Sequence, residues 1–332
     1  MRGFLCSIHG WRVGVKALTI APLLLACSAA IGGGAWAQAP KLEVQPSQPA
    51  PGALVRLTLT IDSLADLVTN VRGTMAGEPL HFVAAGKGIW RALGAVPVDG
   101  EDSLYARVVI RRTSGTLEAT RTALALQPLP APSVTTSPRL SVSERFTRPL
   151  DAATRARIAR ENALARAVGR RAHESAPRWA GAFLKPRTSR VTSEFGTGRA
   201  FNGAVASRHL GVDFAGAVGA PIKAANRGVV ALVDTFFLAG RVVYIDHGGG
   251  LVTGYFHMSE PLVSKGDTVA RGQTIGRVGS TGRVTGPHLH WTARYGTLTV
   301  NPLDLISLEP DWYRTPGSVV SQGTRARPGG SK

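Results

Sequence analysis

Apolar and polar residues alternate in short runs over residues 41–127. Two examples are 55–61 (VRLTLTI) and 104–110 (LYARVVI), and turns rich in Pro, Gly and Asp separate the runs. Successive side chains of a strand point to opposite faces of a sheet, so this period of two is typical of strands with one buried face. The pattern predicts a small antiparallel β-sandwich, immunoglobulin-like, over residues 41–127.

The composition changes after this predicted sandwich. Residues 128–138 (PLPAPSVTTSP) are rich in Pro, which favours an extended linker. Residues 151–173 are rich in Ala and Arg and lack Pro, so we expect one helix with Asp151 as its N-cap. Its arginines fall on several faces, which favours a solvated connector that lies on the next domain over a membrane-surface helix. Residues 128–184 are therefore expected to be linker and connector helix.

The first 37 residues have the layout of a signal peptide. Basic residues come first, at Arg2, Arg12 and Lys16, followed by an apolar run over 17–26 and by Ala-Trp-Ala before Gln38. No later run is long enough to cross a bilayer, so we expect an exported protein of the periplasm or cell envelope. The only cysteines, Cys6 and Cys27, lie in this leader.

A second processing site competes with cleavage after Ala37. Residues 24–27 (LLAC) resemble the lipobox of bacterial lipoproteins, in which the cysteine is acylated, although Leu25 is less usual there than a small residue. We favour cleavage after Ala37 over lipid anchoring at Cys27. At the other end, residues 316–332 are rich in Gly, Ser and Arg, which predicts a disordered tail.

The chain is strongly basic, with 39 Lys and Arg against 21 Asp and Glu and a formal net charge of +18. The leader contains three of the basic residues and no acidic one, so the exported part remains basic. Such a surface favours polyanions, and outside the cytoplasm these are cell-wall polymers with carboxylate-bearing stem peptides and lipid head groups. Nucleic acid is disfavoured as a partner, because the basic residues are spread out and form no nucleic-acid motif.

Histidine is concentrated in one part of the chain. Of eight histidines, five lie in a Gly-rich, β-like stretch, at positions 209, 247, 257, 288 and 290. His288 and His290 would share one face of a strand, so two imidazoles could meet at one site. Two histidines and one carboxylate leave a tetrahedral zinc with one open position, as in hydrolytic zinc sites. We expect His247 to be a turn residue or to support a ligand, and His81 and His173 to be ordinary surface or half-buried residues.

Three motifs follow one another in this stretch: H-x-x-x-D at 209–213, Tyr-x-His at 255–257 and H-x-H at 288–290. As an ordered set they resemble the LytM/lysostaphin-type zinc metallopeptidases, over about residues 185–306. The resemblance implies a C-terminal antiparallel β-sheet metallopeptidase domain. With the predicted immunoglobulin-like N-terminal β-sandwich and helical connector, we therefore expect a mostly β protein. We expect Trp291 and Tyr255 to be packing residues.

The resemblance also implies a role for each motif residue. His209, Asp213 and His290 correspond to the zinc ligands. His257 and His288 correspond to the two histidines that orient and deprotonate the zinc-bound water or hold charge in the transition state. The implied function is an exported zinc endopeptidase that hydrolyses the peptide cross-links of peptidoglycan, and its implied partners are peptidoglycan stem peptides.

Two other functions stay open. Some relatives of this family activate wall amidases after losing zinc ligands, but this chain keeps all five motif residues. Alternatively, residues 41–127 could make the chain chiefly a wall-binding adaptor, or could bind wall-remodelling proteins. We also consider that the linker lets the N-terminal domain fold back over the active groove. The motifs do not reveal which cross-link is cut.

Overall fold

The computed structural model describes residues 39–309 apart from 62–66, 100–102, 130, 132–134, 136, 180 and 204. The described residues belong to one compact unit. The predicted signal peptide, the predicted tail and part of the Pro-rich linker lie outside these residues. None of the helices in the described ranges is long and apolar enough to cross a membrane.

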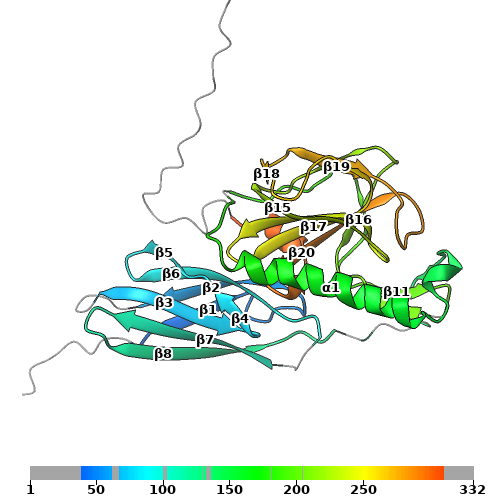
Figure 1. Cartoon of the computed structure of the whole chain (residues 1–332). Helices are drawn as coiled ribbons and strands as arrows, with labels where there is room; N and C mark the ends of the chain where they lie inside the picture. The colour runs from blue at the N-terminus through cyan, green and yellow to red at the C-terminus, as the bar shows by residue number, and fades with distance from the viewer. Residues whose placement is uncertain are drawn as a thin grey trace, which may run out of the picture. The chain divides into compact units, whose positions relative to one another are not determined.

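The N-terminal part is a sandwich of two antiparallel four-stranded sheets, as the alternating pattern predicts (Figure 1). One sheet has the order β1-β2-β6-β5, with bounds Lys41–Gln45, Leu54–Thr60, Ile89–Ala95 and Val83–Gly86. The other has the order β4-β3-β7-β8, with bounds Glu78–Leu80, Val68–Met75, Ser103–Arg112 and Leu117–Ala125. Alternate residues of β2 and β7 point inward and form the core, among them Leu57, Leu59, Val108 and Ile110.

The C-terminal part is built on a ten-stranded antiparallel sheet. Its main path is β10-β13-β20-β17-β16-β15-β18, with bounds Val191–Ser193, Val212–Ala215, His288–Tyr295, Leu251–Pro261, Gly240–Gly248, Gly228–Phe236 and Thr268–Val269. The strands β14 (Pro221–Lys223), β19 (Thr274–Val278) and β21 (Leu298–Val300) pair beside this path. Apolar residues on both faces of the central strands are buried, so helix and loops must cover the sheet.

The helix α1 (Ala152–Ala172) covers part of this sheet (Figure 1). Asp151 caps it as predicted, because its carboxylate accepts a hydrogen bond of 2.6 Å from the Thr154 N–H. Ala165 and Val168 pack against Tyr244 and Val252 of the sheet. The helix thus lies on the C-terminal domain through a narrow face of small residues, while its arginines lie mostly outside that contact.

A short segment after the Pro-rich linker joins the fold as a strand. Residues Arg139–Leu140 (β9) pair in parallel with β11 (Gly198–Phe201), which also pairs with β12 (Val205–Arg208). The chain then forms a short 3₁₀ turn, η1 (Glu144–Phe146), before α1. The connector is therefore fixed to the C-terminal part at a second place besides the helix.

The sandwich packs directly on the C-terminal sheet. Leu54 and Leu93 belong to the same buried cluster as Phe214 and Trp291. The Leu54 N–H donates to the Asp304 carboxylate at 2.8 Å, just inside the short helix α2 (Leu303–Ile306). The described part of the chain therefore has a shared apolar interface between its two β parts.

Two histidines expected to be ordinary lie in this interface. His81 Nε2 is 2.8 Å from His173 Nδ1, and His173 Nε2 is 3.0 Å from the Glu78 carboxylate. Glu78 also accepts from the Thr297 N–H at 2.8 Å. Both histidines are half-buried, as expected, but they link the sandwich to the end of α1. Spacing along the sequence gave no sign of this link, because its members are far apart in the chain.

Candidate metal centre and its groove

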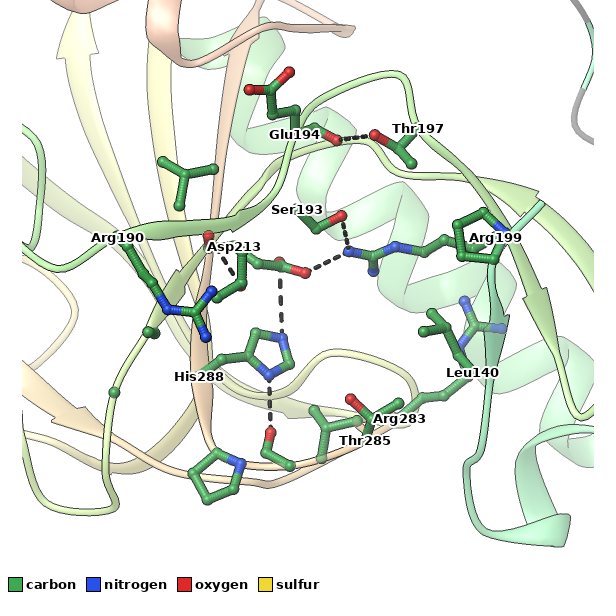
Figure 2. Close-up of a pocket in the computed structure, with 18 of the residues that line it drawn as sticks. Leu140, Arg190, Ser193, Glu194, Thr197, Arg199, Asp213, Arg283, Thr285 and His288 are labelled. Atoms are coloured by element: carbon green, nitrogen blue, oxygen red, sulfur yellow. Dashed lines mark hydrogen bonds and ion pairs between the residues drawn. The ribbon is translucent and has the colours of Figure 1, made fainter.

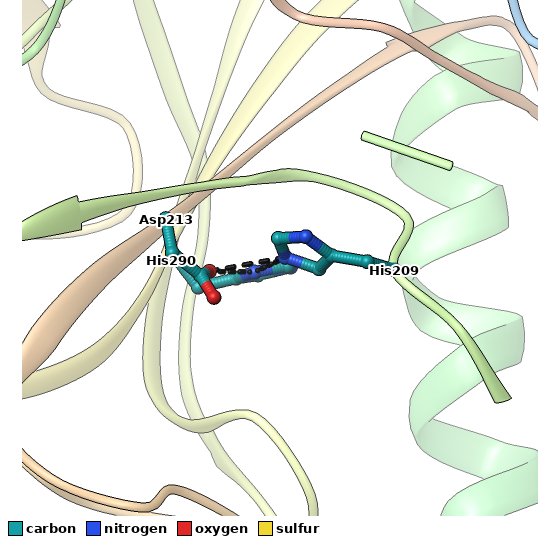
Figure 3. A group of neighbouring side chains, drawn as sticks. All are labelled: His209, Asp213 and His290. Carbon is teal, nitrogen blue, oxygen red and sulfur yellow. Dashed lines mark hydrogen bonds and ion pairs between the residues drawn. The ribbon is translucent and has the colours of Figure 1, made fainter. Parts of the chain in front are cut away.

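Strand register brings together two of the three predicted ligands. In the pair β13–β20, Asp213 lies directly opposite His290, and Ala215 lies opposite His288. His209 lies just before β13, where its N–H donates to the Thr197 carbonyl and its own carbonyl accepts from Gly196. Figure 3 shows the three side chains meeting at one point.

The donor atoms of this group are close enough to share one cation. His209 Nε2 is 3.0 Å from Asp213 Oδ1 and 2.9 Å from His290 Nδ1, and His290 Nδ1 is 2.7 Å from Asp213 Oδ1. All three side chains are buried or nearly so. Two imidazole nitrogens and a carboxylate oxygen are a donor set that suits a tetrahedral zinc ion with one further position.

The protonation of His209 can be read from its other nitrogen. His209 Nδ1 is 2.8 Å from the Glu194 carbonyl oxygen, which can only accept a hydrogen bond. Nδ1 therefore carries the proton, and Nε2 directs a lone pair at Asp213 and His290. Of the three converging atoms, only His290 Nδ1 can carry a proton. One proton cannot satisfy the lone pairs of all three atoms, whereas a cation between them would.

The charge states of the other two residues also suit a metal. Burial raises the pKa of Asp213, but the neighbouring His209 and His290 side chains outweigh it and hold this pKa well below its usual range. Burial lowers the pKa of His290 to about 4, against the opposing effect of Asp213. At neutral pH the site therefore contains a carboxylate and a neutral imidazole, the forms that bind metals.

Two neighbours hold this arrangement in place. A Cβ atom at Gly211 would lie 2.6 Å from His290 Cε1 and 2.6 Å from the Trp291 carbonyl oxygen, so the residue between His209 and Asp213 must be small. Arg199 forms an ion pair with Asp213 Oδ2, which leaves Oδ1 facing the histidines. The sequence pattern did not reveal Arg199, because nothing in its spacing links it to the motifs.

His257 and His288 lie beside the three converging side chains. Their ring centroids are 4.9 Å apart, and the ring of His257 is 5.8 Å from that of His290. Each holds its Nδ1 at 2.8 Å from a backbone carbonyl oxygen, that of Thr281 for His257 and that of Gly286 for His288. In the neutral form, each ring therefore carries its proton on Nδ1 and leaves Nε2 unprotonated. His288 Nε2 is 3.7 Å from Asp213 Oδ1.

The backbone at His257 departs from regular strand geometry. β17 pairs with β20 as far as Phe256, opposite His290, and from Met258 onward it pairs with β19. His257 lies at this change of partner with a φ of 61°, a conformation that is uncommon outside glycine. Burial, and then the charges of His290 and His288, lower its pKa well below the ordinary value. The bulge turns this side chain toward the centre.

A groove with a cavity of about 690 Å³ opens beside the centre. Asp213 and His288 lie in its wall, together with residues of β9, β10 and β11 and of the loop that precedes β20. Figure 2 shows His288 and Asp213 in the middle of this opening. No described residue of the sandwich lines it, so in this structure the described sandwich residues do not cover the groove.

The remaining residues singled out in the sequence lie in the core. His247 is fully buried in β16, 2.8 Å from both the Arg227 carbonyl and Thr253 Oγ1, and takes no part in the converging group. Tyr255 and Trp291 are fully buried, which confirms that they are packing residues. The Tyr255 hydroxyl accepts from the Ala225 N–H at 2.8 Å beneath the sheet.

Comparison with known proteins places this geometry in context. Residues 207–302 match Peptidase family M23. A crystal structure from Pseudomonas aeruginosa assigned to peptidase M23 superposes with a TM-score of 0.57 and 26% identity, over 78% of this chain and 95% of that one.

Two curated relatives match part of the chain. Peptidoglycan DD-endopeptidase ShyA of Vibrio cholerae is 49% identical over 83 residues, which is 25% of this chain and 19% of ShyA. DD-carboxypeptidase/endopeptidase Mpg of Neisseria meningitidis is 40% identical over 103 residues, 31% of this chain and 24% of Mpg. The matches thus span about a quarter or less of these relatives' own length.

Proposed function

Because residues 207–302 form a peptidase M23 domain, we propose that this chain is an exported zinc endopeptidase that hydrolyses peptide cross-links of peptidoglycan. One observation carries the proposal: two histidines and one carboxylate converge beside His257 and His288, and Asp213 and His288 lie in the wall of an open groove. The proposed catalytic domain is residues 185–306.

In this proposal His209 Nε2, Asp213 Oδ1 and His290 Nδ1 hold the metal. Zinc, when bound, supplies a Lewis acid that polarises the amide carbonyl and lowers the pKa of water toward neutrality. The carboxylate neutralises part of the charge of the ion. Arg199 keeps the second oxygen of Asp213 turned away from the histidines, so that only one carboxylate oxygen faces the metal.

His288 and His257 have the proposed catalytic roles. With Nδ1 held by a carbonyl, His288 Nε2 can accept a proton from the attacking water and pass it to the nitrogen of the leaving amine. The water oxygen bonds to the amide carbon, the C–N bond breaks, and a carboxylic acid and an amine are released. His257, held in the same way, orients the reacting groups and stabilises the negative charge that develops on the amide oxygen.

The relatives suggest which cross-link is cut. ShyA is named a peptidoglycan DD-endopeptidase and Mpg a DD-carboxypeptidase/endopeptidase. The prefix DD denotes an amide bond between two D-configured centres. We propose the same bond class for this chain. The groove is open along β9 and β10, so it could accept an extended peptide from the wall.

We further propose that the chain acts in the cell envelope. The leader over residues 1–37 and the basic composition support export and attraction to an anionic wall. The sandwich over residues 41–127 then supplies a surface for the wall or for wall-remodelling proteins, and it stays anchored to the catalytic domain through the interface at Leu54 and Asp304.

The test is digestion of purified peptidoglycan by residues 38–332, followed by mass analysis of the released fragments. We expect cross-linked dimers to disappear and monomers to form, a chelator to stop the reaction, and added zinc to restore it. If zinc binds but dimers persist, the proposal is wrong, and a non-catalytic wall-binding protein or an activator of wall amidases becomes the better account.

A further inference from the structure

Three arginines line the groove around the metal centre. Arg190 lies next to β10, Arg199 lies in β11, and Arg283 lies in the loop before β20. Figure 2 shows Arg190 on one side of His288 and Arg199 and Arg283 on the other. Only one acidic residue besides Asp213 is among the described lining residues, Glu194, and Figure 2 shows its carboxylate directed away from these arginines.

The three guanidinium groups differ in their partners. Arg199 is neutralised by Asp213 and also donates to Ser193 Oγ at 2.9 Å. Arg283 has no hydrogen bond or ion pair from its guanidinium to any described residue, and it lies over the ring of Phe201 at 4.0 Å. The exposed Arg190 side chain likewise has no such partner within the described ranges.

Arg283 is therefore a mostly buried cation beside another cation. Burial, and then the charge of Arg199, lower the pKa of Arg283 to about 10. A buried charge without a counter-ion is costly, and the contact with Phe201 compensates only part of this cost. Because the cost falls when an anion enters the groove, the free site is prepared for a negatively charged group.

We propose that Arg283, assisted by Arg190, binds a free carboxylate of the substrate next to the scissile amide, and so determines specificity for acidic cross-links. The inference rests on the proposed function. In an amide between two D-configured centres, the nitrogen is attached to an α-carbon that also carries a carboxyl group. When no further residue is attached to this carboxyl group, it is a free carboxylate a few bonds from the nitrogen that becomes the leaving amine.

The geometry suits this ligand. Arg283 and His288 line the same groove, so one substrate residue can direct its carboxylate to Arg283 and its nitrogen to His288. A guanidinium offers two parallel N–H donors to a carboxylate, which fixes the orientation as well as the charge. Phe201 holds the guanidinium plane in place before substrate enters.

The test uses two cross-linked peptides that differ only at this carboxyl, which is free in one and a carboxamide in the other. Zinc-loaded wild type (residues 38–332) should prefer the free carboxylate by about 10- to 100-fold in kcat/KM, as charged hydrogen bonds typically contribute. In Arg283→Gln this preference should disappear through a higher KM for the acidic peptide, with a much smaller change on the carboxamide peptide. Arg283→Lys should restore part of the preference, Arg190→Gln should reduce it less, and Arg160→Gln, on the exposed side of α1, should leave it unchanged.

The outcomes separate this inference from the proposed function. Equal cleavage of both peptides by the wild type, or an equal loss on both peptides in Arg283→Gln, would overturn the carboxylate subsite while leaving the endopeptidase intact. If the wild type cleaves neither peptide, the proposed function fails, and the subsite is decided by binding of both fluorescently labelled peptides. Tighter binding of the acidic peptide, lost in Arg283→Gln, would still support it, and equal binding would overturn it.

Discussion

His209, His257 and His288 share one structural device, because each holds its Nδ1 against a backbone carbonyl oxygen at 2.8 Å. The main chain therefore selects the tautomer of each ring, and Nε2 is the atom left for a metal or for a substrate proton. The roles of these residues are consequently separable: removing a ligand should abolish metal binding, while removing a base should leave the metal in place.

Substitution at His209 and at His288 should give different results. His209→Ala or Asp213→Ala removes one of three converging donors, so zinc content and activity should be lost together. His288→Ala leaves the donors intact, so zinc should remain while kcat falls by about 10²- to 10⁴-fold, the usual contribution of a general base. Metal analysis by mass spectrometry beside turnover assays checks both. Loss of zinc from His288→Ala would refute this assignment of roles.

The glycine between His209 and Asp213 should be as sensitive as the ligands. Gly211→Ala would place a methyl group 2.6 Å from the His290 ring and from a backbone oxygen, so the ring must move and zinc affinity should fall at least tenfold, a common effect of disturbing ligand support. Gly286→Ala is the matched control, because a methyl group there meets nothing within 4 Å. Zinc titration against a competing chelator measures both. Equal affinities would contradict the packing argument.

At the scale of elements, the regular patterns of the sequence predicted the structure best. The alternating runs of β2 and β7 and the Pro-free segment of α1 each carry their own signal, so strands, helix and N-cap were predictable. Two features were not. The bulge at His257 depends on β17 changing its partner from β20 to β19, and β9 exists only because β11 offers a free edge. Both depend on distant residues.

The contact between α1 and the β20–β21 hairpin gives a prediction for this helix. A Cβ atom at Gly169 would lie 1.8 Å from the Gly296 carbonyl oxygen, so the helix approaches the hairpin more closely than alanine allows. Gly169→Ala should therefore destabilise the protein by about 2 kcal/mol through this clash, although alanine is the better helix former.

The exposed position Ala159 supplies the matched control, where Ala159→Gly should cost about 1 kcal/mol from helix propensity alone. Denaturant unfolding of both variants beside the wild type gives the free energies. A more stable Gly169→Ala variant would mean that the close approach of α1 does not exist in solution.

At the scale of the whole molecule, two carboxyl groups lie where the sandwich meets the catalytic sheet, and their pKa values shift in opposite directions. Burial raises the pKa of Glu78, but hydrogen bonds from His173 and Thr297 outweigh it and lower this pKa, so Glu78 favours the interface as a carboxylate. Burial raises the pKa of Asp304 to about 6, against the hydrogen bond from the Leu54 N–H. At neutral pH, ionisation of the buried Asp304 carboxyl therefore destabilises the folded state.

This difference predicts a pH dependence of stability. Because the folded-state pKa of Asp304 lies above its ordinary value of 3.8, its contribution to the free energy of unfolding is fully present below pH 3.8 and is lost as the pH rises through about 6. Asp304→Asn should keep the acceptor for Leu54 without the charge. It should match the wild type near about pH 3 and exceed its stability by on the order of 3 kcal/mol at about pH 7.5.

Thermal unfolding across this pH range measures the effect, and Asp99→Asn, at an exposed carboxyl, is the control. If the difference between Asp304→Asn and the wild type does not change with pH, then Asp304 is not buried against Leu54 in solution.

The candidate site could be found in the sequence because its spacings are short. H-x-H on one strand places His288 and His290 on one face, and H-x-x-x-D places Asp213 on the neighbouring strand, opposite His290. The residues that support it were not predictable: Arg199, Arg283 and Glu78 are ordinary charged residues until the fold brings them to Asp213, Phe201 and His173. Their positions follow from tertiary packing and not from any local pattern.

The most direct test of the central claim is hydrolysis of purified peptidoglycan by residues 38–332 in water enriched in ¹⁸O, with zinc present and with a chelator. We predict that zinc-dependent loss of cross-linked dimers will leave one heavy oxygen atom in the carboxyl group newly formed on the released peptide. Persistence of the dimers, or their loss without heavy oxygen at that carboxyl group, would contradict a metal-dependent endopeptidase that uses water as its nucleophile.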